Sequence, residues 1–173
     1  GHKGISCFIV EKGLDGFECG KAENKLGIRS SDTCEIYFDN VKIPLENRIG
    51  EEGEGFKIAL STLDGGRIGI ASQALGIANA SLNCSIKYSK ERKQFGKPIS
   101  NNQSIQFKIA DMAMELEAAR LLTWKAAWHK DQHKDFSALA SMAKVYSSEV
   151  AMRASTQCVQ IHGGYGFISE TGV

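Results

Sequence analysis

The distribution of proline constrains the fold of this chain of 173 residues more than any other feature of its sequence. Between Pro44 and Val173 there is one proline, Pro98. Because proline lacks a backbone donor and clashes with the preceding helical turn, a stretch almost free of it can form long uninterrupted helices. The chain after Pro44 is therefore expected to be helical, with a loop at Pro98.

Apolar residues in this stretch recur at helical spacings, which predicts helices over residues 56–90, 104–130 and 137–162. The residues expected to face the core are Ala59, Leu60, Leu63, Ile70, Ala74, Ala78, Leu82 and Ile86 in the first helix, Ile105, Ile109, Met112, Leu116 and Ala119 in the second, and Met142, Val145, Val150 and Cys158 in the third. Ser137 is expected to cap the third helix, and the glycines at 163 and 164 are expected to end it. Long amphipathic helices with short connections indicate an up-down antiparallel bundle, here with three of four helices.

Residues 4–44 read as β structure. Residues 5–10 form an apolar run, residues 33–38 alternate between apolar and polar, and residues 41–44 follow a turn. Two or three strands are too few to bury the face of a sheet. We therefore expect an α+β chain, mainly α, in which residues 1–50 are the end of a small β domain and residues 51–173 a helical bundle.

Composition excludes several functions. With 21 Lys and Arg against 20 Asp and Glu, the formal net charge of +1 gives no reason to expect a nucleic-acid surface. No apolar run is long enough to predict a membrane span. Five cysteines without a C-x-x-C pair argue against a disulfide framework or structural zinc, and favour a reducing compartment. His129 and His133 have the spacing of metal ligands, but no Glu-x-x-His accompanies them, so no metal site is expected.

The loop of residues 91–99, ERKQFGKPI, could bind a phosphate group. The guanidinium of Arg92 offers a planar fork of donors, and Gln94 adds a neutral hydrogen-bonding group beside it. Phe95 could anchor the loop. The alternative is an ordinary basic loop at a helix end, where positive charge answers the helix dipole.

Residues 160–166, QIHGGYG, could approach a bulky ligand. Three glycines in four positions allow close approach of the backbone, and the amide of Gln160 can bind the edge of a heterocycle. The alternative is a glycine helix stop with Tyr165 packed beside it.

Residues 64–67, DGGR, place two glycines inside the first predicted helix. Each costs roughly 1 kcal/mol relative to alanine, which suggests that something approaches the backbone there. Asp64 and Arg67 share a helix face and can pair. The alternative is a glycine kink with a surface ion pair.

Taken together, residues 64–71, 91–96 and 160–166 resemble, in order and spacing, motifs of the acyl-CoA dehydrogenase family. Residues 25–31 and 50–56 resemble the family too. The likeness covers essentially the whole chain and is closest to short-chain and short/branched-chain members. It implies that the chain is the C-terminal half of such a protein, carrying the end of the middle β domain and most of the C-terminal four-helix bundle.

The resemblance also implies an FAD cofactor that lies between the subunits of a homo-oligomer, a dimer of dimers. In this chain Arg92 and Gln94 would hold the pyrophosphate, and Phe95 would pack beside the cofactor. The adenosine side would be contacted by Gln103, Gln160, Ile161, His162, Gly163 and Gly164. The acyl-CoA channel would be lined by Asp64, Gly65, Gly66 and Arg67.

The reaction implied is dehydrogenation of short or branched acyl-CoA thioesters to trans-2-enoyl-CoA, with electrons passed to an electron-transferring flavoprotein. The family's glutamate base lies either at the position of Gly66 or in an aromatic-Glu-Gly segment, which is expected beyond Val173. No catalytic residue is therefore expected within these 173 residues, and alone they are expected to be inactive.

Two alternatives remain open from sequence: an acyl-CoA oxidase-like enzyme, which would produce peroxide, and a non-catalytic helical module for assembly or ligand binding. The expected location is the mitochondrial matrix, with the bacterial cytoplasm as the alternative.

Overall fold

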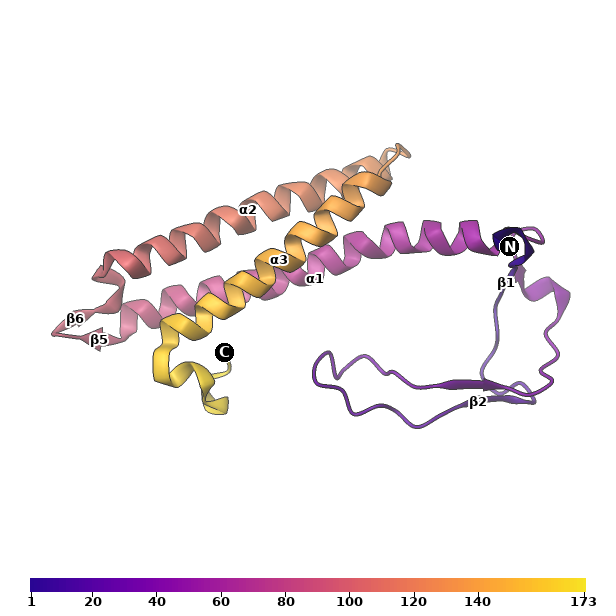
Figure 1. Ribbon diagram of the computed structural model, residues 1–173, viewed down its shortest axis with the longest axis horizontal. Helices are drawn as coiled ribbons and strands as arrows, with labels where there is room; N and C mark the ends of the chain where they lie inside the picture. Colours follow the sequence, from indigo (N-terminus) through magenta and orange to yellow (C-terminus); the bar gives the residue numbers. More distant parts are fainter. The chain divides into compact units, whose positions relative to one another are not determined.

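The computed structural model describes all 173 residues, which form two compact units, Gly1–Ser61 and Thr62–Val173. Three long helices dominate the chain, and the strands are few and short (Figure 1). The predicted fold class, mainly α with a small β portion, is confirmed.

The first unit contains two antiparallel two-stranded ribbons. In one, β1 (Cys7–Phe8) pairs with β4 (Arg48–Ile49), and in the other β2 (Phe17–Cys19) pairs with β3 (Ile36–Phe38). Short 3-10 turns, η1 (His2–Gly4) and η2 (Leu45–Asn47), accompany them. The rings of Phe17 and Phe38 face each other across the second ribbon, with their centroids 5.2 Å apart.

Two expectations for this unit are wrong. Residues 41–44 form no strand, because Pro44 leads directly into the turn η2. The strands that pair in this unit, β2 and β4, lie at positions that the sequence pattern did not predict. Cys34, Ile36 and Phe38 are exposed rather than half-buried. A two-stranded ribbon pairs its backbone but buries neither of its faces, so the alternation of residues 33–38 has no core to face.

The long helices are α1 (Gly55–Glu91), α2 (Gln103–Asp131) and α3 (Ser137–His162), so the predicted bounds hold to within one residue. A hairpin of β5 (Lys93–Gln94) and β6 (Lys97–Pro98), followed by η3 (Ile99–Asn101), connects α1 to α2. Two 3-10 turns, η4 (Gly163–Phe167) and η5 (Ser169–Thr171), follow α3. No helix is both long enough and apolar enough to cross a membrane.

The C-terminal end of α3 agrees with the prediction, whereas the predicted cap at its N-terminal end is wrong. Ser137 is the first helical residue and not the cap; its backbone N–H donates to Oδ1 of Asp135 at 3.2 Å. Gly163 ends the helix as predicted, with φ 58° and ψ −130°, a combination that glycine adopts far more readily than other residues.

Small side chains make up most of the core. The larger cluster contains Ala74, Ala78, Leu82, Met112, Leu116, Ala119, Val150, Ala151, Ala154 and Ile161, and the smaller one contains Ala71, Ala126 and Ala143. Helices whose contacting side chains are this short can approach closely. The buried set therefore includes only part of the predicted residues of each helix; on α2, Met112, Leu116 and Ala119 are buried, whereas Ile105 and Ile109 are partly buried.

Five larger apolar residues predicted to be in the core are exposed instead: Leu60, Leu63, Ile70, Met142 and Val145. On α3 the buried face runs through Ala140, Ala143, Val150 and Ala154, and Met142 and Val145 lie off that face. They line a shallow apolar groove with Leu122 of α2.

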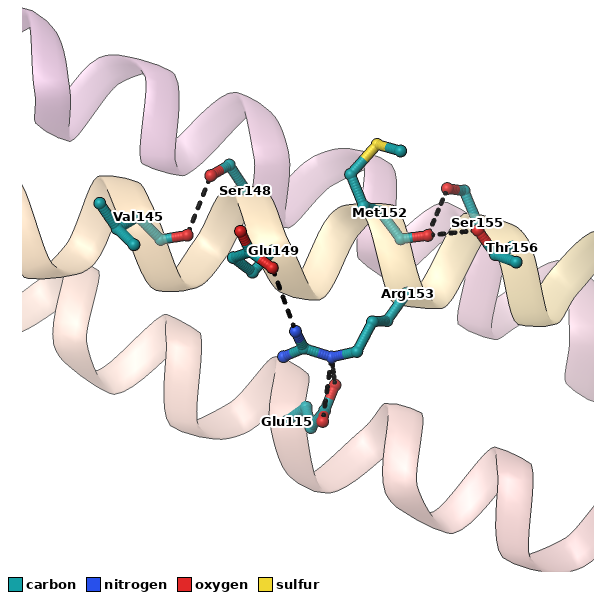
Figure 2. A network of polar contacts seen from close by, with 8 residues as sticks. All are labelled: Glu115, Val145, Ser148, Glu149, Met152, Arg153, Ser155 and Thr156. Carbon is teal, nitrogen blue, oxygen red and sulfur yellow. Dashed lines mark hydrogen bonds and ion pairs between the residues drawn. The ribbon is translucent and has the colours of Figure 1, made fainter.

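Arg153 connects α3 to α2 (Figure 2). Its Nε donates to both carboxylate oxygens of Glu115, at 2.9 and 3.2 Å, and its Nη1 lies 3.6 Å from the carboxylate of Glu149. The hydrogen bond to Glu115 is the main reason why the pKa of Arg153 is raised above its ordinary value. The pair fixes the register of the two helices near the middle of the bundle.

Candidate functional site

A depression of about 370 Å³ lies where α1 and α3 end, next to the connecting hairpin. Six residues predicted to bind a cofactor line it: Arg92, Gln94, Ile161, His162, Gly163 and Gly164. Tyr88, Ile99, Tyr165 and Ile168 complete the wall. Residues almost 70 positions apart in the sequence thus form one concave surface of a size typical of ligand sites.

Arg92 is held in place by its backbone and by one aromatic ring. Its N–H donates to the carbonyl of Tyr88 at 2.8 Å, and its own carbonyl accepts from Ile99 N–H at 2.9 Å. Its Cζ lies 5.4 Å from the centre of the Tyr165 ring, a cation–π contact. None of the ion pairs of the structure involves Arg92. An exposed guanidinium without an acidic partner is free to bind an anion.

The hairpin beside Arg92 ends in a strained turn. Phe95 and Gly96, the two residues between β5 and β6, have φ of 52° and 79°. Positive φ at both positions is the geometry of a type I′ turn, which favours Asn-Gly and is unfavourable for a bulky residue. The Phe95 side chain is nevertheless 99% exposed. Backbone strain together with an exposed aromatic ring suggests that the ring binds a surface outside this chain.

The glycines after α3 are present for different reasons. A Cβ on Gly166 would lie 2.3 Å from the carbonyl oxygen of Val159, so the packing of the chain requires glycine there. A Cβ on Gly163 or Gly164 would meet nothing within 4 Å. Gly163 has the positive φ described above, whereas Gly164 has neither a positive φ nor a close neighbour. Its bare backbone faces open space at the wall of the depression.

His162 is 5% exposed, which leaves little of its imidazole accessible at the wall. The ring stacks on Tyr88 with centroids 4.1 Å apart, and the Tyr88 hydroxyl donates to the His162 carbonyl at 3.3 Å. Its Nε2 lies 3.6 Å from Sγ of Cys84, and its Nδ1 lies 2.8 Å from the carbonyl oxygen of Cys158. Sequence reasoning missed this cluster of two thiols and an imidazole. Its one visible signal was the i, i+4 spacing of Cys158 and His162 on a predicted helix.

Three other residues predicted to contact a cofactor do not line the depression: Phe95, Gln103 and Gln160. Gln103 is the first residue of α2, Gln160 lies in the last turn of α3, and both are exposed. Their roles remain predictions that depend on a ligand larger than the depression.

The predicted substrate segment lies elsewhere on α1. Asp64 and Arg67 form a partly buried ion pair, and the helix continues past Gly65 and Gly66 without a break. A Cβ on Gly65 would lie 3.2 Å from Nζ of Lys130 on α2, while one on Gly66 would meet nothing. At a rise of 1.5 Å per residue, Asp64 and Tyr88 are about 36 Å apart along the helix, so this segment and the depression are separate sites.

Comparison with known proteins agrees with the motifs. The family model described as "Acyl-CoA dehydrogenase, C-terminal domain" matches residues 53–173. The short-chain specific acyl-CoA dehydrogenase of Megasphaera elsdenii is 56% identical over 170 residues, 98% of this chain and 44% of that protein. The mitochondrial short-chain specific acyl-CoA dehydrogenase of Mus musculus is 55% identical over 169 residues, 98% of this chain and 41% of that protein.

Solved structures agree as well. The butyryl-CoA dehydrogenase of Megasphaera elsdenii superposes with a TM-score of 0.96 at 56% identity, covering 98% of this chain and 44% of that one. A chain solved in work on the electron transferring flavoprotein of Acidaminococcus fermentans gives 0.96 at 54%, covering 98% and 45%. PigA with FAD and proline gives 0.94 at 33%, covering 99% and 45%. The chain therefore spans less than half the length of each of these proteins.

Proposed function

The chain belongs to the acyl-CoA dehydrogenase family, and from that we propose that the full-length protein containing it is an FAD-dependent dehydrogenase of short acyl-CoA thioesters, which yields trans-2-enoyl-CoA. One observation carries the proposal: the depression combines a guanidinium without an acidic partner with a glycine backbone open to a ligand. PigA, solved with FAD, has the same fold in this region.

The residues of the depression fit an FAD. Arg92 and Gln94 hold the pyrophosphate, since a guanidinium and an amide both donate hydrogen bonds to phosphate oxygens. The open backbone at Gly163 and Gly164 lets the adenosine side approach, with Ile161 and His162 behind it and Gln160 and Gln103 at its margin. Phe95 packs against the cofactor from the strained hairpin. When bound, the flavin supplies the acceptor for the β-hydrogen of the substrate.

The substrate segment on α1 would contact the CoA portion of the thioester. Asp64 and Arg67 present a fixed pair of opposite charges, and Gly66 leaves the helix backbone open beside them. No carboxylate lines the depression, and Gly66 has no side chain to remove a proton. Residues 1–173 therefore bind and orient ligands, and we propose that they have no dehydrogenase activity when produced alone.

Substrate range, partners and location are proposed from the relatives and from the resemblance to the family. Two are named short-chain specific, so we expect a straight chain of about four carbons to be preferred over a branched one. We propose that an electron-transferring flavoprotein accepts the electrons and that the protein is a homo-oligomer, a dimer of dimers. The division into a β domain of residues 1–50 and a bundle of residues 51–173 is part of this proposal. For a eukaryotic source we propose the mitochondrial matrix, and for a bacterial source the cytoplasm.

Anaerobic titration of the full-length protein with acyl-CoA thioesters tests this function. Butyryl-CoA is expected to bleach the flavin absorbance faster than isovaleryl-CoA or octanoyl-CoA, and an electron-transferring flavoprotein is expected to restore it. Absence of bleaching by any acyl-CoA would exclude a dehydrogenase. Stoichiometric peroxide formation in air would instead indicate an oxidase.

A further inference from the structure

Cys84 of α1 and Cys158 and His162 of α3 form a cluster inside the bundle, of which the proposed function uses only His162. Their Sγ and imidazole nitrogen atoms all lie within 4.8 Å of one another. Cys158 and His162 are buried, and Cys84 is partly buried. His162 also lines the depression, whereas neither cysteine does.

The distances in the cluster are close to those of a metal site. Zinc bonds of about 2.3 Å to sulfur and about 2.0–2.1 Å to nitrogen, at tetrahedral angles, place sulfur and nitrogen ligands about 3.6 Å apart. Sγ of Cys84 and Nε2 of His162 are 3.6 Å apart. Sγ of Cys158 lies 3.8 Å from the other ring nitrogen, Nδ1, so binding of one cation by all three groups requires the Cys158 side chain to turn toward Nε2.

The imidazole is already oriented for coordination through Nε2. Nδ1 lies 2.8 Å from the carbonyl oxygen of Cys158, where it donates a hydrogen bond when it carries the proton. Metal-binding histidines commonly donate their second ring N–H to such an acceptor, which fixes the tautomer and the ring plane. The stacked ring of Tyr88 fixes the plane further.

Charge and access also favour a divalent cation. Two thiolates with a dication form a neutral group, which is much less costly to bury than separate charges. A neighbouring cavity of about 500 Å³ is lined by both Cys84 and Cys158, so the two thiols are within reach of a cation that enters it.

We propose that Cys84, Cys158 and His162 bind a thiophilic divalent cation of the zinc type through two thiolates and Nε2. The site holds the end of α3 against α1, directly behind the glycine turn that lines the depression. His162 is also placed at the adenosine side of the cofactor, so the site is tested by metal binding itself, which does not depend on flavin chemistry.

Equilibrium dialysis of the full-length protein against Zn²⁺ alone, in a non-chelating reductant, tests the proposal. Wild-type protein is expected to bind one more equivalent per chain than the variant Cys84→Ser/Cys158→Ser. Each single variant is expected to weaken binding by more than about 100-fold, since loss of even an outer-shell partner costs 10–100-fold. With ¹¹³Cd²⁺ in place of zinc, the wild-type spectrum is expected to show a resonance in the range of sulfur-coordinated cadmium.

The matched control is Cys19→Ser/Cys34→Ser, which removes two exposed, neighbouring thiols and is expected to bind the same amount of metal as wild type. Equal zinc binding by wild type and the Cys84/Cys158 double variant would overturn the proposal. A Cys84–Cys158 disulfide in purified protein that binds no metal after reduction would overturn it as well. Should the double variant fail to fold, the cadmium spectrum of the folded wild type decides alone, and the absence of a sulfur-coordinated resonance refutes the site.

Discussion

Gly164→Ala separates the role of the glycine turn in ligand binding from its role in folding. The added Cβ would meet no atom of the chain within 4 Å, and Gly164 has no positive φ that alanine would avoid. The free energy of unfolding is therefore expected to change by less than about 0.5 kcal/mol. Gly164 lines the depression where we place the adenosine side of FAD, so the added methyl group is expected to crowd the ligand.

Crowding a close contact by one methyl group costs about 1–3 kcal/mol, which corresponds to roughly 5- to 160-fold weaker binding. We expect this loss in the Kd of FAD, measured by titrating the full-length apoprotein and following flavin fluorescence. Stability is measured in parallel by urea denaturation of the apoprotein. A Kd within twofold of wild type would refute the placement of the ligand at this turn.

Gly166→Ala is the matched control for Gly164→Ala. Its Cβ would lie 2.3 Å from the carbonyl oxygen of Val159, which belongs to the backbone and cannot move aside cheaply. This variant is expected to lose about 1–3 kcal/mol of stability. A variant as stable as wild type would show that the turn after α3 adapts more easily than the structure indicates.

Three further substitutions test other parts of the account in the full-length protein. Glu115→Gln weakens the ion pair with Arg153 and is expected to lower the free energy of unfolding in urea by about 0.3–1 kcal/mol at low salt. The difference is expected to shrink in high salt, and a loss that salt does not change would contradict an electrostatic origin. Phe95→Asn supplies the residue that a type I′ turn prefers, so the free energy of unfolding is expected to rise by about 1 kcal/mol. The same variant is expected to retain less FAD after gel filtration. Unchanged FAD retention would show that Phe95 does not contact the cofactor. Asp64→Asn weakens the ion pair with Arg67 and is expected to raise the KM for acyl-CoA about 2- to 5-fold at unchanged flavin content. The magnitude follows because partly exposed ion pairs contribute up to about 1 kcal/mol. An unchanged KM would place the pair outside the CoA channel.

The bounds of the long helices could be predicted from the sequence because local chemistry decides them. Pro98 cannot continue a helix, and Gly163 adopts the left-handed φ that ends one. The core could be predicted only in part, because helical spacing was used to place large apolar residues and alanines alike, and it does not show which of them the neighbouring helices cover. Helices in close contact buried Ala71 and Ala143 in the centre of the bundle and left Leu63 exposed.

The candidate site, like the core, could be predicted only in part. Arg92 and the glycine turn were found because a loop motif and a helix-ending motif each lie within a few residues. The contact between Arg92 and Tyr165, and the cluster of Cys84 with His162, join residues more than 70 positions apart. Only tertiary packing brings such residues together, so no local pattern could predict them.

The FAD content of the full-length protein shows whether Arg92 and the glycine turn bind the cofactor. Wild-type protein and the variant Arg92→Ala/Gly164→Ala would be purified in parallel, and flavin per chain measured by absorbance after gel filtration. Gly164 is chosen over Gly163 because its replacement does not strain the backbone. We expect wild-type protein to retain flavin. We expect the variant to be folded, as judged by circular dichroism, and to have lost its flavin. A wild type without flavin, or a variant that retains as much as wild type, would contradict this expectation.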